Sequence, residues 1–151
     1  MKRNSDDLLD QPPVNRNLPE LHPPSYILWS AFFGGPLAGG VLFFINFYRT
    51  GHSLTGYITL FGGALLSFVY YYTPVFSSFG LYTFLYTLGY LYLTTVINAK
   101  LNTPIFKKHK SQSGKSAPWY KSTGIVILVI GVNILLLKPH EVLYFFELLR
   151  P

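Results

Sequence analysis

The chain has 151 residues, half of them hydrophobic and 18% aromatic, whereas 12% are charged. A soluble domain carries about 25% charged residues, so the composition argues against an ordinary water-soluble fold. The formal net charge is +6, but between Leu21 and His140 every charged side chain is basic. The chain has no cysteine, which excludes disulfides, thiolate catalysis and Cys-ligated metals.

The first 25 residues contain five prolines among polar side chains. Such a segment can bury little apolar surface and is unlikely to sustain a long helix, so residues 1–25 are predicted to form a disordered tail. Docking of a partner on this proline-rich segment is the alternative.

Four long segments then follow that contain no charged side chain. Crossing about 30 Å of hydrocarbon takes roughly 20 apolar residues, and each segment is interpreted as a membrane span, although the last one is short. The spans are expected at residues 26–48, 54–75, 79–99 and 122–137. The predicted fold is therefore all-α, a four-helix transmembrane bundle over residues 26–137 that is surrounded by the lipid bilayer.

Small residues recur at helical spacing in the first two spans, where close backbone approach favours the association of membrane helices. The sequence predicts that the two helices pack through these positions. They are Ala31, Gly35 and Gly39 in the first span and Thr59, Gly63 and Ser67 in the second.

A proline also lies inside the first span. Pro36 cannot donate the helical hydrogen bond to the carbonyl of Phe32, so a kink is expected there. The alternative is a hinge or an unwound cavity, as in the broken helices of transporters, where freed carbonyls bind ions.

Polar side chains line one face of the third span, at Thr83, Thr87, Tyr90 and Thr94. They predict either a polar path or hydrogen bonds to neighbouring helices.

Six of the twelve basic residues lie between Lys100 and Lys121. Anionic lipid headgroups are the expected partners of this lysine loop, at about 1 kcal/mol per basic residue, and a specific lipid or a protein partner is the alternative. The side chains concerned are Lys107, Lys108, Lys110 and Lys115. Because basic residues near span ends stay cytoplasmic, the loop is predicted inside and both tails outside.

The C-terminal segment, residues 138–151, is too short to span and is apolar apart from a few polar side chains. It is predicted to lie in the membrane interface, or to continue the fourth helix beyond a kink at Pro139.

No catalytic or cofactor motif stands out. The four histidines are scattered without metal-ligand spacing, and no pair of acids lies in the spans. Basic residues beside apolar spans are explained by membrane topology rather than by nucleic-acid binding. No enzymatic activity, cofactor, metal or nucleic-acid partner is expected.

The run Gly35-Pro36-Leu37-Ala38-Gly39-Gly40, followed by Asn46-Phe47-Tyr48-Arg49-Thr50-Gly51, resembles a loose group of small, uncharacterised bacterial four-span membrane proteins. The resemblance implies a bacterial inner-membrane location, and it carries no activity and no site residues.

Two functions remain open. The first is a non-catalytic scaffold or accessory subunit of a membrane complex. The second is a small transporter or channel that acts as an oligomer, with a water-accessible path past Thr83, Thr87 and Tyr90. A protein partner in the membrane or a homo-oligomer is expected accordingly.

Overall fold

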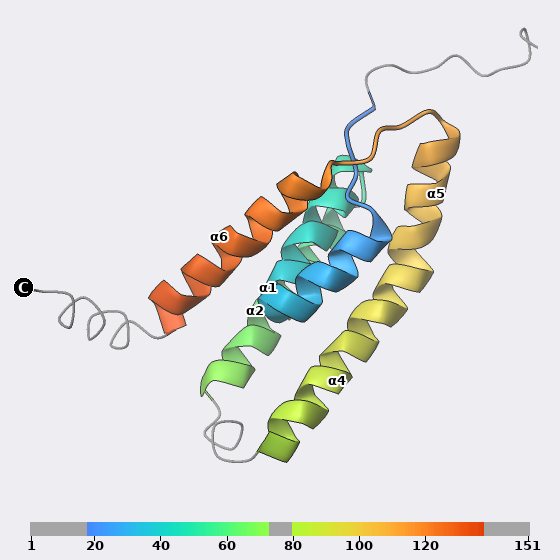
Figure 1. The fold of residues 1–151 in the computed structure, drawn as a ribbon. Helices are drawn as coiled ribbons and strands as arrows, with labels where there is room; N and C mark the ends of the chain where they lie inside the picture. Colours follow the sequence, from blue (N-terminus) through green and yellow to red (C-terminus); the bar gives the residue numbers. More distant parts are fainter. Residues whose placement is uncertain (1–17, 73–79, 138–151) are drawn as a thin grey trace, which may run out of the picture.

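The computed structural model describes residues 18–72 and 80–137 (Figure 1), without the side chains of Tyr71 and of residues 134–137. This part of the chain is helical and forms no strand beyond an isolated bridge. The elements are α1 (Pro24–Arg49), α2 (Ser53–Tyr72), α4 (Gly80–Ile97), the π-helix η2 (Asn98–Asn102), α5 (Thr103–Ser111) and α6 (Trp119–Leu137).

Helix α1 is a hairpin of two half-helices. The backbone leaves helical geometry at Gly35, with φ 74° and ψ −174°, and the chain then returns toward its starting end (Figure 1). The backbone N–H of His22 donates to Oδ1 of Asn46 over 2.8 Å, whereas a straight helix would separate these residues by roughly 36 Å. The predicted single span over residues 26–48 is therefore wrong.

The chain before α1 meets the loop before α6. Leu21 N–H donates to the carbonyl of Lys115 over 3.1 Å, and Ala117 N–H donates to the carbonyl of Leu21 over 2.8 Å. We call the end of the helices that carries residues 18–23, 50–52 and 112–118 the lysine end, and the opposite end the far end.

This pairing corrects two expectations. The chain at residues 18–23 lies at the same end as the lysine loop, not opposite it, because the hairpin replaces a complete crossing. The predicted disordered tail also extends too far, since Leu21 and His22 are buried and α1 already begins at Pro24. Residues 1–17 lie outside the described part of the chain.

The third helical segment is longer than predicted. Helices α4, η2 and α5 follow one another without a break from Gly80 to Ser111, so the first part of the expected lysine loop is helical. Pro104, at the start of α5, has no N–H to offer the preceding turn. The wide π-turn of η2 lies directly before this proline and accommodates it.

The second and fourth predicted segments are helices close to the expected bounds, namely α2 and α6. Within the described residues, three helices are long and apolar enough to cross a membrane: α1, α2 and the run from Gly80 to Ser111. For α1 this holds only if both halves of the hairpin are counted together. The predicted interfacial segment, residues 138–151, lies outside the described residues.

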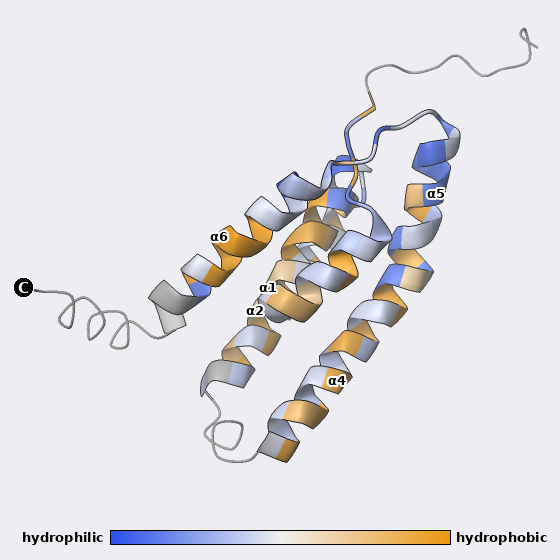
Figure 2. Ribbon diagram, viewed as in Figure 1, coloured by the Kyte–Doolittle hydropathy of each residue, from blue (hydrophilic) through white to orange (hydrophobic). Residues whose placement is uncertain are grey.

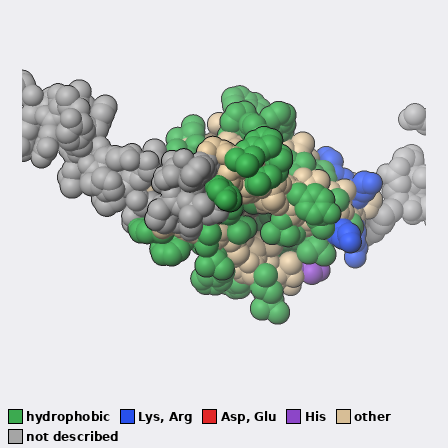
Figure 3. Space-filling model, turned by 90° about the horizontal axis from the view of Figure 1, so that it is seen from below, with side chains coloured by type: hydrophobic (Ala, Val, Ile, Leu, Met, Phe, Trp, Pro, Cys, Tyr) green, Lys and Arg blue, Asp and Glu red, His purple; other side chains and the backbone are tan. Residues whose placement is uncertain are grey.

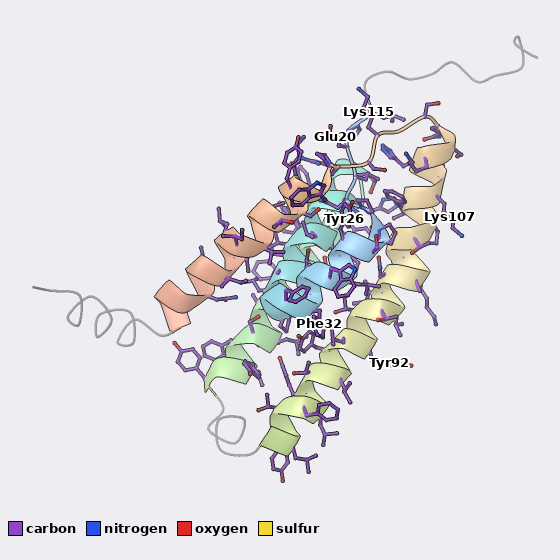
Figure 4. All side chains as sticks on the ribbon, viewed as in Figure 1. Glu20, Tyr26, Phe32, Tyr92, Lys107 and Lys115 are labelled. Carbon is purple, nitrogen blue, oxygen red and sulfur yellow. The ribbon has the colours of Figure 1, made fainter. Side chains whose placement is uncertain are left out.

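The small core lies within the hairpin, where Ile27, Leu42, Phe43 and Phe47 pack together. Hydrophobic residues run along α1, α2, α4 and α6 (Figure 2), and many large apolar side chains are exposed, as on the face shown in Figure 3. Tyr92, which points away from the neighbouring helices (Figure 4), is 73% exposed. Apolar outer faces around a buried polar interior are typical of helices that meet lipid.

Candidate functional site

The reversal of α1 leaves backbone groups without helical partners. The last carbonyls of the first half-helix and the first N–H groups of the second meet at Gly35 and Pro36. Two side chains from other helices satisfy part of this set. Ser67 Oγ of α2 accepts from the Leu37 N–H over 3.1 Å, and the Tyr90 hydroxyl of α4 donates to the carbonyl of Ala31 over 3.2 Å.

A cavity of about 450 Å³ opens at this reversal, where α1, α2, α4 and α6 converge. Hydroxyl groups and one amide contribute to its wall beside a larger apolar part, and among the described residues no Lys, Arg, His, Asp or Glu lines it. Its lining residues are Phe32, Phe33, Gly34, Gly35, Pro36, Ser67, Tyr70, Tyr86, Thr87, Tyr90, Ile130 and Asn133.

The two half-helix ends at the cavity carry partial charges of opposite sign. A helix C-terminus carries about −0.5 of an elementary charge and an N-terminus about +0.5. Both ends lie at Gly35 and Pro36, so the two partial charges largely cancel. The cavity therefore has no net charge from its described lining residues. The hydroxyl oxygens of Tyr86, Thr87 and Tyr90, whose protons bind backbone carbonyls, can accept hydrogen bonds. Asn133 adds an amide. This set suits a neutral polar molecule better than an ion.

The predicted polar face of the third span contributes in part. Thr87 and Tyr90 line the cavity, whereas Thr83 and Thr94 do not. Thr87 Oγ1 donates to the carbonyl of Thr83 over 2.9 Å, and Thr94 is buried. Tyr86, which the sequence pattern omits, lines the cavity and donates to the carbonyl of Leu66 of α2.

The predicted packing residues of the second span do face α1. A Cβ on Gly63 would lie 2.6 Å from the Pro36 carbonyl oxygen, and one on Gly40 would lie 2.7 Å from that of Thr59. Ser67 bonds the Leu37 N–H at the same interface. Gly40, absent from the predicted set, is thus the partner of Gly63.

The predicted role of Ala31, Gly35 and Gly39 as one face against α2 is wrong. Gly39 faces Ala31 across the hairpin, where an added Cβ would lie 2.9 Å from the Ala31 Cβ, so the small residues bring the two half-helices together. Gly35 is the reversal itself and has no neighbour within 4 Å of an added Cβ. Pro36 begins the second half-helix, and the expected kink is a complete reversal.

A chain of buried hydrogen bonds holds the hairpin near the lysine end. Asn46 Nδ2 donates to the carbonyl of His22 over 2.8 Å and to Asn102 Oδ1 over 3.0 Å. Asn102 Nδ2 donates in turn to Asn98 Oδ1, and Asn98 Nδ2 donates to the carbonyl of Pro24, both over 2.8 Å. The π-helix thus supplies both of its buried asparagines to α1 and the segment before it.

His22 extends this chain to α6, since its Nδ1 shares a 2.7 Å hydrogen bond with Ser122 Oγ. Burial, reinforced by the charge of Arg49, lowers the pKa of His22 from 6.5 to about 4. The histidine is therefore neutral at physiological pH and acts as a structural link. The sequence shows only isolated polar residues near helix ends and gives no sign that they meet.

Lys107 and Lys115 lie toward the lysine end (Figure 4), and all four predicted headgroup-binding lysines have exposed side chains. Lys107, Lys108 and Lys110 belong to α5, and Lys115 belongs to the following loop. Glu20, the one acid among the described residues, pairs with Lys121 at 2.5 Å. The Lys121 hydrogen bond lowers the pKa of the Glu20 carboxyl.

Within the described residues, no three His, Asp or Glu side chains come together as a metal site would require. Comparison of the chain with protein-family models, with curated proteins and with solved structures finds no match to any of them.

Proposed function

We propose that this is an integral membrane protein with three spans and a re-entrant hairpin, and that it binds a small neutral polar solute and lets it pass. It acts as a transporter or channel and performs no catalytic step. The observation that carries this proposal is the broken helix α1, whose reversal at Gly35 opens on a hydroxyl-lined cavity of about 450 Å³.

The lengths of the half-helices support a hairpin that stops inside the bilayer. At about 1.5 Å per residue, residues 24–34 rise roughly 16 Å and residues 36–49 roughly 21 Å. Neither half reaches across about 30 Å of hydrocarbon. A reversal at that depth is stable only where protein or a polar cavity covers its free backbone groups. Ser67 and Tyr90 supply such cover here.

The charge distribution supports a lysine end on the cytoplasmic side of the membrane. That end carries Glu20 as its acid, and its basic residues are Arg49, Lys107, Lys108, Lys110, Lys115 and Lys121. Basic residues near span ends stay on the cytoplasmic side. Because of the hairpin, residues 18–23 then lie on the cytoplasmic side too, while α6 ends outside. The exposed lysines face anionic headgroups.

A flux measurement tests the proposal. Purified protein reconstituted in liposomes is mixed with glycerol or urea, and swelling is followed by light scattering. We expect faster swelling than in empty liposomes for at least one neutral solute. Asn133→Leu, which places an apolar side chain of similar size in the cavity wall, is expected to remove this increase.

Thr95→Val is the matched control, because Thr95 lies on the exposed side of α4 and does not line the cavity. Its swelling rate is expected to equal that of the natural protein. Folded protein that leaves the swelling rate of empty liposomes unchanged for every solute contradicts the proposal.

The second candidate is a non-catalytic subunit or scaffold that docks a transmembrane helix of a partner. The observation in its favour is an apolar groove of about 280 Å³ between α1 and α6. Its walls include Trp29 and Trp119, which are 60% and 64% exposed. Purification in mild detergent with a stoichiometric partner and without solute flux favours this candidate.

A further inference from the structure

We infer that the lysine end contains a phosphate-binding cavity, separate from the cavity at the reversal of α1. It has a volume of about 320 Å³ and lies between residues 18–19, the end of α1 with its following turn, and α5. The polar residues of its wall are Arg49, Thr50, His52, Lys108, His109 and Gln112. Two segments far apart in the sequence, residues 49–52 and 108–112, thus place cationic and neutral polar side chains around one space, and Leu18 and Pro19 add an apolar part of its wall.

Arg49 is held in position at this cavity. Its Nη1 donates to the carbonyl of Glu20 over 2.6 Å, which uses one of the five N–H donors of a guanidinium. The carboxylate of Glu20 is already paired with Lys121, so it does not neutralise Lys108. Among the described residues no other acid is present to compete for these cations.

The C-terminal ends of α1 and α5 disfavour an anion in this cavity. Each helix C-terminus carries about −0.5 of an elementary charge, and both lie beside the cavity. Their last carbonyls are capped, since Thr50 N–H donates to the Asn46 carbonyl and Gln112 N–H to the Lys108 carbonyl. Two full positive charges from Arg49 and Lys108 exceed two capped partial charges, and the cavity remains positive.

The donor set fits a phosphate group. An arginine fork and a lysine ammonium are the side chains that most often hold phosphate oxygens, and Gln112 adds an amide. The Thr50 hydroxyl lines the cavity but donates to the Asn46 carbonyl of α1 over 2.9 Å. The volume also leaves room for a small organic group on the phosphate. A free phosphate compound and the headgroup of an anionic phospholipid share this chemistry.

A phosphate-binding cavity predicts a difference between the lysines that general attraction of the lysines to lipid does not predict. Lys107 and Lys110 are neighbours of Lys108 on α5 but do not line the cavity. Attraction through the summed charge treats the three lysines alike, whereas a built site depends on Lys108. The variants Lys108→Gln and Lys107→Gln therefore form a matched pair that removes the same charge one residue apart.

The test uses the full chain in neutral maltoside micelles, titrated with inorganic phosphate at constant ionic strength and followed by thermal unfolding. A second arm uses native mass spectrometry with phosphatidylglycerol against phosphatidylcholine. We expect saturable binding in at least one arm. Lys108→Gln is expected to weaken that binding by about tenfold or more, because it removes a charged hydrogen bond. Lys107→Gln is expected to leave the affinity within about twofold.

The arms separate the two sources, since binding of phosphatidylglycerol without inorganic phosphate identifies a lipid headgroup. Equal losses in both variants, or no saturable binding in either arm, overturn the inference. Lys108 is exposed, so its replacement is not expected to unfold the protein, and circular dichroism checks this. Solute flux through the cavity at Gly35 is an independent outcome, because the two cavities share no lining residue.

Discussion

At the crossing of α1 and α2, two glycines let backbone meet backbone. A Cβ on Gly63 would lie 2.6 Å from the Pro36 carbonyl oxygen, whereas one on the adjacent Gly62 would have no neighbour within 4 Å. We expect Gly63→Leu to lower the free energy of unfolding by about 1 to 3 kcal/mol, the usual range for overpacking. Gly62→Leu is expected to leave it unchanged or to raise it by up to about 1 kcal/mol, because glycine is a poor helix former.

Unfolding in mixed micelles of SDS and maltoside, followed by circular dichroism, measures both values. Equal effects of the two substitutions would show that α2 does not present Gly63 to α1.

His22 makes stability depend on pH. Its pKa is lowered by burial from 6.5 to about 4, so between these values the unfolded chain binds a proton that the folded chain does not. The stability that neutral His22 contributes is therefore complete above about pH 6.5 and is lost as the pH falls toward 4. At about 1.4 kcal/mol per unit, the loss amounts to roughly 3 kcal/mol.

Of this loss, about 2 kcal/mol falls between about pH 7 and pH 5, where the thermal unfolding midpoint measures it. In His22→Gln the fall of the unfolding midpoint with decreasing pH is expected to be smaller. His52 is exposed, so His52→Gln is expected to show the same fall as the natural protein. An unchanged decline in His22→Gln would place the responsible group elsewhere.

At the level of the elements, substitution of one glycine in α1 tests whether this segment is a hairpin or a straight helix. The φ of 74° and ψ of −174° at Gly35 lie in a region that only glycine adopts readily. Gly35→Ala is therefore expected to destabilise the protein by about 1 to 3 kcal/mol. In a straight helix the same change would stabilise it by up to about 1 kcal/mol. The sign of the change in unfolding free energy therefore distinguishes the hairpin from the straight helix.

Gly124→Ala provides the comparison, because Gly124 lies within α6 and has no neighbour within 4 Å of an added Cβ. This substitution is expected to be stabilising or neutral. Stabilisation by both substitutions in the same unfolding assay would argue for an unbroken α1.

Sequence patterns identified α2 and α6 because an uninterrupted apolar run predicts one helix. They failed for α1, since two antiparallel half-helices have the same composition and length as one span. Gly35 and Pro36 mark the position of the break in the sequence, but its angle depends on contacts with residues far away. The bonds of Ser67 and Tyr90 to the broken backbone are such contacts.

Dependence on contacts between distant residues also explains why the sequence predicted only some of the residues at the site. Thr87 and Tyr90 belong to a periodic polar face that a sequence can show, whereas Asn133 is an isolated polar residue in the apolar second half of α6. The bond between Asn46 and Asn102 joins two elements separated by 56 residues. No local pattern encodes that pairing, because each asparagine alone fits a helix end equally well.

For the whole molecule, the hairpin fixes which ends of the chain share a side. Cysteine-free protein allows single-cysteine labelling in intact cells with a membrane-impermeant maleimide. Because Leu21 pairs with Lys115 and Ala117, Leu18→Cys and Gln112→Cys are expected to behave alike. In the proposed orientation, with the lysine end inside, both are expected to react only after the membrane is permeabilised. Gly80→Cys, at the far end, is expected to react without permeabilisation.

The three labels separate two questions. Opposite behaviour of Leu18→Cys and Gln112→Cys would mean that α1 crosses the membrane as one span and that the hairpin is wrong. Reaction of both in intact cells, with Gly80→Cys protected, would retain the hairpin and reverse the orientation. The first outcome removes the basis of the proposed solute cavity, because the reversal at Gly35 creates it. The second outcome leaves that cavity in place and moves the phosphate-binding cavity to the outer surface.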